Sequence, residues 1–218
     1  MRKIFKIVCV VLMIPFLFVG CAQNRELIKS NARQRALIQS LSSEVERLQQ
    51  ELDKVSEMGA GLEQTKLELE EKLKAQVQQG DLAVTLDDRG VVVTILNKIL
   101  FESGKTDIKE SAKETLSLLS SSIRNLAEGQ VVYIEGHTDS DPILKSGFKS
   151  NWELSTARAT EVIHYVVDNF NVDPQMLVAS GYGEFRAVAS NATVEGKAKN
   201  RRVEVIISPK PRLYVTQE

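Results

Sequence analysis

The sequence predicts an α+β domain, with two helices packed on a mixed β-sheet, preceded by a long α-helical coiled-coil segment. Apolar residues recur with a helical period up to Gly80 and alternate along the chain after it. The elements that follow run in the order ββαβαββ, which is typical of helices packed on one sheet. The 218 residues, 43% of them apolar, suffice for a packed core. They divide into a signal (1–20), a stalk (21–79), the domain (80–208) and a flexible tail (209–218).

The first twenty residues have the layout of a secretory signal. Three basic residues within the first six precede an apolar run over residues 7–19, and Gly20 stands directly before Cys21. The alternative is an uncleaved membrane helix. The apolar stretch from Ile4 is interrupted by Pro15 and lies at the short limit for spanning a bilayer. We therefore expect export.

Cys21 is expected to carry lipid. It would be the one cysteine left in the exported chain, so it has no partner for an internal disulfide. "FVGC" resembles a bacterial lipobox, although Phe18 and Val19 depart from the usual residues. Acyl chains, at about 0.8 kcal/mol per buried methylene, would hold the protein on a membrane. By the same resemblance, Ala22 favours the outer membrane, with the chain facing the periplasm.

Residues 25–79 contain no proline and no aromatic residue, and they predict a helix. Their apolar residues recur at heptad spacing, which predicts a coiled-coil seam and a homo-oligomer. A continuous helix would reach ~80 Å. Gly59 and Gly61 would weaken or bend it, which leaves one helix or a hairpin open, and a solvated single helix is the alternative to self-association. The seam consists of Leu27, Leu41, Leu48, Val55, Leu62 and Leu69, with Ile38, Val45, Leu52 and Leu73 as the companion set.

The remaining elements follow from alternation and turn signals. Residues 82–95 predict two short strands around a hairpin turn at Asp88-Arg89-Gly90. Asp107 and Glu110 are spaced as the N-cap and third residue of the next helix. Further strands are expected over 131–136, 177–184 and 201–208, with a helix over 151–170.

Polar side chains gather where the strand "VVYIEG" ends. This strand delivers "HTD", His137 to Asp139, to a loop, and loops at strand ends often carry sites. Ser150 with Glu153 fits a capping box, so the next helix should begin at Asn151.

Two arginines are expected to face this loop. Helical phase places Arg158 with Asn151 beside the buried stripe of the helix. Strand parity places Arg201 on the face that also carries Val203, so its guanidinium needs a partner, either Asp139, another acid or a ligand.

Four separated motifs, "GHTD", "NWELSTARA", "GYGE" and "EGKAKNRRVEV", resemble the OmpA-like peptidoglycan-binding domain over roughly residues 96–207. The resemblance implies a site for the meso-diaminopimelate of the stem peptide. The loop between Asp139 and Asn151 is longer than in most porin-type members and closer to MotB-like chains. By this resemblance Asp139 is the acid and Arg158 the base, Asn151 and Arg201 support them, and Thr138 and Leu154 shape the wall.

The residue types suit that ligand. The free end of diaminopimelate carries an ammonium and a carboxylate on one carbon. Asp139 can accept from the ammonium, and the Arg158 fork can hold the carboxylate through two hydrogen bonds. The first turn of the helix adds N–H groups that favour an anion. Plain lysine lacks the carboxylate and would leave Arg158 unpaired.

Other function classes find little support. There is no nucleophile-elbow motif, so we expect no enzyme. His137 and His164 are the only histidines and have no partners at zinc spacing, so we expect no metal or cofactor, and a structural role for His137 within its strand end. Without the leader, 25 Lys and Arg face 29 Asp and Glu, which gives no reason to expect nucleic acid.

The sequence therefore predicts a lipoprotein that tethers the outer membrane to peptidoglycan without covalent chemistry. The alternative is a MotB-like motor-associated or envelope scaffold protein whose coiled coil binds a protein partner. Proton conduction is not expected, because residues 4–20 contain no Asp or Glu.

Overall fold

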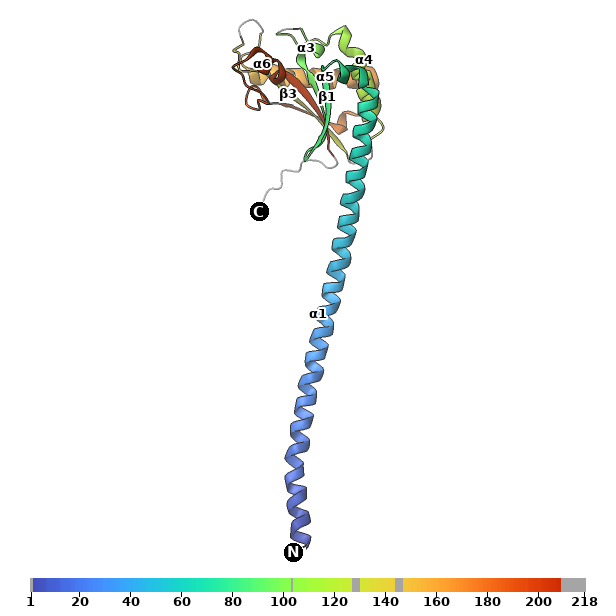
Figure 1. Ribbon diagram of the computed structural model, residues 1–218, viewed down its shortest axis with the longest axis vertical. Helices are drawn as coiled ribbons and strands as arrows, with labels where there is room; N and C mark the ends of the chain where they lie inside the picture. The colour runs from blue at the N-terminus through green and yellow to red at the C-terminus, as the bar shows by residue number, and fades with distance from the viewer. Residues whose placement is uncertain (1, 103, 127–129, 144–146, 209–218) are drawn as a thin grey trace. The chain divides into compact units, whose positions relative to one another are not determined.

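A computed structural model describes the backbone of residues 2–102, 104–126, 130–143 and 147–208, and their side chains from residue 25 on (Figure 1). The chain divides into two compact units, Met1–Glu57 and Met58–Glu218. The side chains of the predicted signal and of Cys21, and the predicted tail at 209–218, lie outside the described part. Among the residues whose side chains are described, from residue 25 on, no helix is long and apolar enough to cross a membrane.

The predicted stalk is helical. Helix α1 (Arg2–Lys72) includes Gly59 and Gly61 without a break, which answers the question left open in favour of one helix. In the first unit the seam residues are solvent-exposed, with 49 to 67% of each residue accessible: Leu27, Ile38, Leu41, Val45, Leu48, Leu52 and Val55. So regular an apolar stripe is typical of a coiled coil, and self-association stays a prediction.

Sedimentation can test the stripe. We expect the full-length protein in detergent to sediment as an oligomer at micromolar concentration. Leu41→Glu with Leu48→Glu should shift it toward monomer, because both charges would lie in the seam. The control is Glu44→Gln, outside the seam. A wild-type protein that stays monomeric would contradict the predicted coiled coil.

The C-terminal part of α1 has a different role. Leu69 and Leu73 are fully buried and pack in the core of the second unit, with Leu62 and Val77 partly buried against it. Helix α2 (Lys74–Gln78) follows directly. The heptad spacing predicts Leu69 and Leu73 as seam residues, whereas within this chain they pack in the core of the domain. The period alone does not distinguish these two uses, because a core-facing helix and a coiled coil repeat almost alike.

A five-stranded mixed sheet is the centre of the second unit. The strand order is β1-β2-β5-β3-β4, with β3 and β4 parallel and the other pairs antiparallel. The turn was predicted at Asp88-Arg89-Gly90; because Asp87 pairs with Gly90, the turn itself consists of Asp88 and Arg89, and Gly90 is the first residue of β2. The strands are β1 (Leu82–Asp87), β2 (Gly90–Leu96), β3 (Val131–His137), β4 (Leu177–Gly181) and β5 (Arg202–Ser208).

Two helices match the predicted pair, α4 (Lys113–Ile123) and α5 (Asn151–Phe170). The expected N-cap at Asp107 is wrong. Ile108 forms an isolated bridge with Phe101, which keeps this stretch extended, and the chain turns into α4 only through η1 (Glu110–Ala112). Three short elements were not predicted: α3 (Asn97–Leu100), η2 (Pro174–Met176) and α6 (Val194–Asn200).

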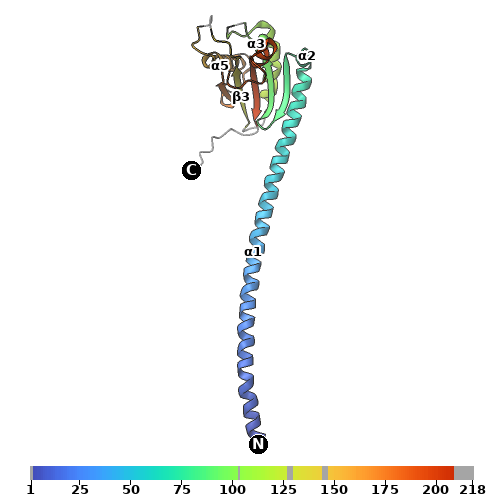
Figure 2. The same cartoon turned by 60° about the vertical axis from the view of Figure 1, so that its left-hand side comes forward.

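The hydrophobic core lies on one face of the sheet. Alternate residues of the central strands, such as Val93, Ile134 and Val205, pack there with α4, α5 and the end of α1. Helix α5 lies against β3 and β4 (Figure 2). Its approach is close, since a Cβ on Gly136 would stand 2.1 Å from the Ser155 carbonyl oxygen. This glycine brings the end of β3 beside the start of α5.

Candidate functional site

One cavity, of about 870 Å³, lies where β3 ends and α5 begins. Its lining includes all six residues that the sequence assigns to a binding site: Thr138, Asp139, Asn151, Leu154, Arg158 and Arg201. The structure therefore brings together residues from the strand end, the helix and the segment before β5. Their part in binding stays a prediction.

Backbone contacts fix the strand end. The Thr138 amide donates to the Gly183 carbonyl at 2.9 Å, and the Gly183 amide donates to Ser155 Oγ at 3.0 Å. The "GYG" segment, Gly181 to Gly183, therefore joins the end of β3 to α5. The Thr138 hydroxyl donates to the Asp139 carbonyl at 2.9 Å, so it supports the loop. Leu154 is only 4% exposed and forms an apolar wall.

The start of α5 confirms the predicted cap. Ser150 Oγ accepts from the Trp152 amide at 3.2 Å and also contacts the Glu153 carboxylate. The next residue, Asn151, uses its side-chain amide three times: it donates to the carbonyls of Asp139 at 3.3 Å and Asp141 at 3.1 Å, and to Glu184 Oε2 at 2.9 Å. Asn151 therefore ties the loop to the helix and positions Asp139.

Asp139 and Arg201 form an ion pair. Asp139 is only 5% exposed, whereas the Arg201 side chain is partly accessible at the cavity mouth. Arg201 is the C-cap of α6 rather than a residue of β5. Arg201 thus pairs with Asp139, one of the partners predicted for it, although β5 begins one residue later, at Arg202. A buried carboxylate needs such a partner to stay charged.

Arg158 lies deeper and is differently satisfied. The residue is 5% exposed, its Nε donates to the Lys105 carbonyl at 3.2 Å, and its guanidinium carbon lies 5.3 Å from the centre of the Phe101 ring. In the part of the chain that is described, this is the guanidinium's only hydrogen bond. Burial, and then the charge of Arg201, lower its pKa to about 10, so it remains a cation at neutral pH. It can therefore hold an anion with its remaining donors.

Sequence reasoning missed one wall of the cavity. The segment between β2 and η1 contributes Phe101 and Lys105 beneath Arg158, together with Asn97, Lys98, Glu102, Gly104 and Lys109. Two of these lysines already have acid partners, Lys98 with Asp81 at 2.7 Å and Lys109 with Glu102 at 3.3 Å. A glycine shortly after Phe101 could have indicated this wall, since Gly104 has a φ of +73°, a conformation that favours glycine.

Asp141 is exposed at the rim of the cavity. Its amide donates to Asp139 Oδ1 at 3.1 Å and its carboxylate accepts from Lys197 at 2.7 Å. Pro142 and Ile143 extend the same rim. The predicted long loop continues into residues 144–146, outside the described part.

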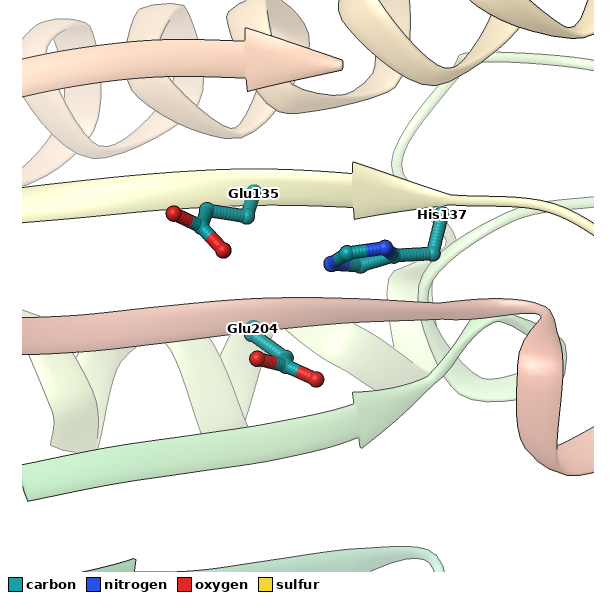
Figure 3. Close-up of side chains that lie close together, drawn as sticks. All are labelled: Glu135, His137 and Glu204. Atoms are coloured by element: carbon teal, nitrogen blue, oxygen red, sulfur yellow. The ribbon is translucent and has the colours of Figure 1, made fainter. Parts of the chain in front are cut away.

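A second polar cluster lies on the other face of the sheet. Oxygen and nitrogen atoms of Glu135, His137 and Glu204 lie within 4.8 Å of one another, with the His137 ring directed toward the two carboxylates (Figure 3). The expectation that His137 bonds within its strand end holds for its backbone, whose carbonyl accepts from Asn97 Nδ2 at 3.4 Å. It is wrong for the ring. The ring nitrogens have no hydrogen-bond partner among the described residues, and the ring stacks on Tyr182 at 5.4 Å.

The carboxylates of this cluster are paired with arginines. Arg89 Nη1 lies 2.8 Å from Glu204 and 3.4 Å from Glu135, Arg202 Nε lies 2.6 Å from Glu204, and Arg186 reaches Glu135 at 3.8 Å. Three guanidiniums around two carboxylates would repel a divalent cation. The arrangement is that of a structural ion-pair network. Burial and the charge of Arg202 lower the pKa of His137 to about 3.

Comparison with known proteins shows which family and which relatives the domain resembles. Residues 100–201 match the OmpA family. Motility protein B of Bacillus subtilis is 39% identical over 153 residues, which cover 68% of this chain and 57% of that protein. The chain spans about half the length of the curated relatives it matches.

Two solved structures share the fold. The cell wall anchor of the T6SS from Pseudomonas aeruginosa has a TM-score of 0.58 and 32% identity, covering 64% of this chain and 96% of that one. The periplasmic domain of Helicobacter pylori MotB has a TM-score of 0.55 and 28% identity, covering 58% and 81%. These matches confirm the predicted α+β architecture.

Proposed function

Since residues 100–201 form a domain of the OmpA family, we propose that this chain binds peptidoglycan noncovalently through the cavity, which holds the diaminopimelate of a stem peptide. The observation that carries the proposal is the buried Arg158 guanidinium, whose only hydrogen bond in the described structure is through Nε, in a cavity that the buried Asp139 also lines. The likeness to a structure described as a cell wall anchor supports it.

The two charges match the two ends of the ligand. The ligand carboxylate accepts from the terminal nitrogens of Arg158, which adds charge-assisted hydrogen bonds to a guanidinium that is already desolvated. The ligand ammonium donates to Asp139, whose carboxylate is also paired with Arg201. Arg201 shares Asp139 with the ammonium or turns toward a second ligand carboxylate. The chemistry is binding alone, with no bond made or broken.

Cosedimentation with purified sacculi tests this function. We expect the wild-type protein to pellet with the wall and Asp139→Ala to remain in the supernatant, because removing the carboxylate leaves the ammonium and Arg201 unpaired. The matched control is Asp168→Ala, on α5 and outside the cavity lining. Undiminished binding by a folded Asp139→Ala protein would rule out the proposed site.

With the lipid anchor and the stalk, the wall-binding domain would tether the outer membrane to peptidoglycan. Lipid on Cys21 fixes the chain to the outer membrane, facing the periplasm, and the helical stalk lies between this residue and the wall-binding domain in the sequence. An oligomer formed through the seam presents several sites to a repeating polymer, and the high effective concentration raises the avidity.

Substitution of the anchor residue gives a direct test. Cys21→Ser should move the protein from the outer-membrane fraction to the soluble periplasmic fraction, because acyl chains supply most of the membrane affinity. The measurement is cell fractionation with immunoblotting. A substituted chain that still fractionates with the outer membrane would remove lipidation from the proposal.

A second candidate function is favoured by the 39% identity to Motility protein B. In this reading the domain localises the chain at the wall, and the exposed seam of α1 binds a partner protein of a motor or envelope assembly. The two readings share the cavity and differ in what the seam contacts. Crosslinking in cells, with one photoreactive residue at Leu48, would yield this chain alone or a second protein.

A further inference from the structure

An exposed aromatic pair stands near the cavity. The Trp152 and Phe185 rings are stacked, with centroids 5.2 Å apart and planes 23° from parallel. Both residues remain accessible, 48% for Trp152 and 66% for Phe185. Large aromatic side chains dominate interface energetics, and a stacked pair left in water marks a contact surface.

The pair is held by the residues that build the cavity rim. Trp152 follows Asn151, and its amide is bound by the helix cap Ser150. Phe185 follows Glu184, whose carboxylate accepts from the Asn151 amide at 2.9 Å. The Phe185 amide donates to the Tyr182 carbonyl at 3.2 Å. Asn151 therefore lines the cavity and also joins the two backbone segments that carry the rings.

We propose that Trp152 and Phe185 bind a sugar ring of the glycan strand whose stem peptide enters the cavity. This inference rests on the proposed function. In peptidoglycan the stem peptide is attached to a sugar, and diaminopimelate is its third residue. Three extended residues span at most about 10 Å. A stem peptide anchored in the cavity therefore brings its sugar close to the rim.

The chemistry of a pyranose ring fits an exposed aromatic surface. One face of the ring presents C–H groups that pack on an aromatic ring, while the hydroxyl and acetamido groups at its edge stay in water. Each aromatic side chain offers ~150–250 Å², whereas a stable protein interface buries about 800 Å² on each partner. The pair is thus sized for one or two sugars rather than for a protein.

The fluorescence of Trp152 can report ligand binding at the aromatic pair, because it is the single tryptophan of the chain. The full-length protein in detergent is titrated with two ligands: a disaccharide muropeptide, and the same diaminopimelate peptide without sugars. We expect about tenfold tighter binding of the muropeptide, accompanied by a change in tryptophan emission that the bare peptide does not produce.

Substitutions distinguish the contribution of the aromatic pair to binding from that of the cavity. Phe185→Ala and Trp152→Ala, followed by calorimetry, should bind the muropeptide about tenfold more weakly and the bare peptide as well as wild type. Val188→Ala, also exposed, is the matched control and should change neither affinity. Asp139→Ala should lose both ligands.

Each other outcome has a defined meaning. Equal wild-type affinity for the two ligands with unchanged emission would overturn the sugar contact and leave the proposed function intact, with a protein partner then the occupant of the pair. Equal weakening of both ligands in Phe185→Ala would show a structural role for the pair and also overturn the inference. A wild-type protein that binds neither ligand would overturn the proposed function itself.

Discussion

Arg158→Ala is expected to weaken binding of a diaminopimelate muropeptide by about 100-fold, or about 2.8 kcal/mol. The guanidinium supplies the buried positive charge of the cavity, and its fork geometry suits a carboxylate. Arg158→Lys keeps the charge and loses the fork and the Nε bond to the Lys105 carbonyl, so we expect an intermediate loss of about tenfold. Calorimetry with the full-length protein gives both values.

The matched control is Arg124→Ala. Arg124 donates to the Phe170 carbonyl at 3.1 Å and is not among the residues lining the cavity, so its removal should leave the affinity unchanged. Circular dichroism must show that each variant is folded. A folded Arg158→Ala protein with wild-type affinity would contradict the proposed role of this residue.

The second large effect is an acid-dependent loss of stability caused by His137. Its pKa in the folded protein is about 3, below the ordinary value of 6.5, so the unfolded chain takes up the proton first. Stability is therefore complete above pH 6.5 and is lost as the pH falls toward 3. The free energy of unfolding should decrease by ~1.4 kcal/mol per pH unit, and by about 5 kcal/mol over the full range.

Urea unfolding between pH 7 and pH 5 isolates this contribution. Burial opposes the charged form of Glu204, but hydrogen bonds from Arg202 and Arg89 outweigh it and lower the pKa of this carboxyl. That lowered pKa affects stability only below the ordinary value of 4.5. His137→Phe retains a ring that can stack on Tyr182 and should show a nearly flat profile in this interval. His164→Gln, at an exposed position, is the control and should keep the wild-type slope. Equal slopes in wild type and His137→Phe would contradict the assignment.

Local periodicity was enough to predict the central part of the cavity. The helical wheel separated Arg158 and Asn151 from the buried stripe, and both indeed face the cavity. Strand parity predicts that the Arg201 guanidinium requires a partner, and in the structure that partner is Asp139. These inferences succeeded because each depends on the geometry of a single element or on its immediate neighbour.

One of the parts that were missed depends on strand order. β5 is last in the sequence and inserts between β2 and β3, which brings Glu204 beside Glu135 and places Arg89 across both. The spacing of these residues in the sequence does not predict that β5 lies between β2 and β3. The wall formed by Phe101 and Lys105 was missed for another reason: its contact with Arg158 depends on how α5 packs over the sheet.

The most direct test of the central claim compares two muropeptides that differ only in the third residue of the stem peptide. One carries meso-diaminopimelate and the other carries lysine, which lacks the second carboxylate. Because that carboxylate is the partner proposed for Arg158, calorimetry should show about 100-fold weaker binding of the lysine form by the wild-type protein. Arg158→Ala should remove most of the difference. Equal affinity of the wild-type protein for the two muropeptides would contradict the two-charge recognition of diaminopimelate.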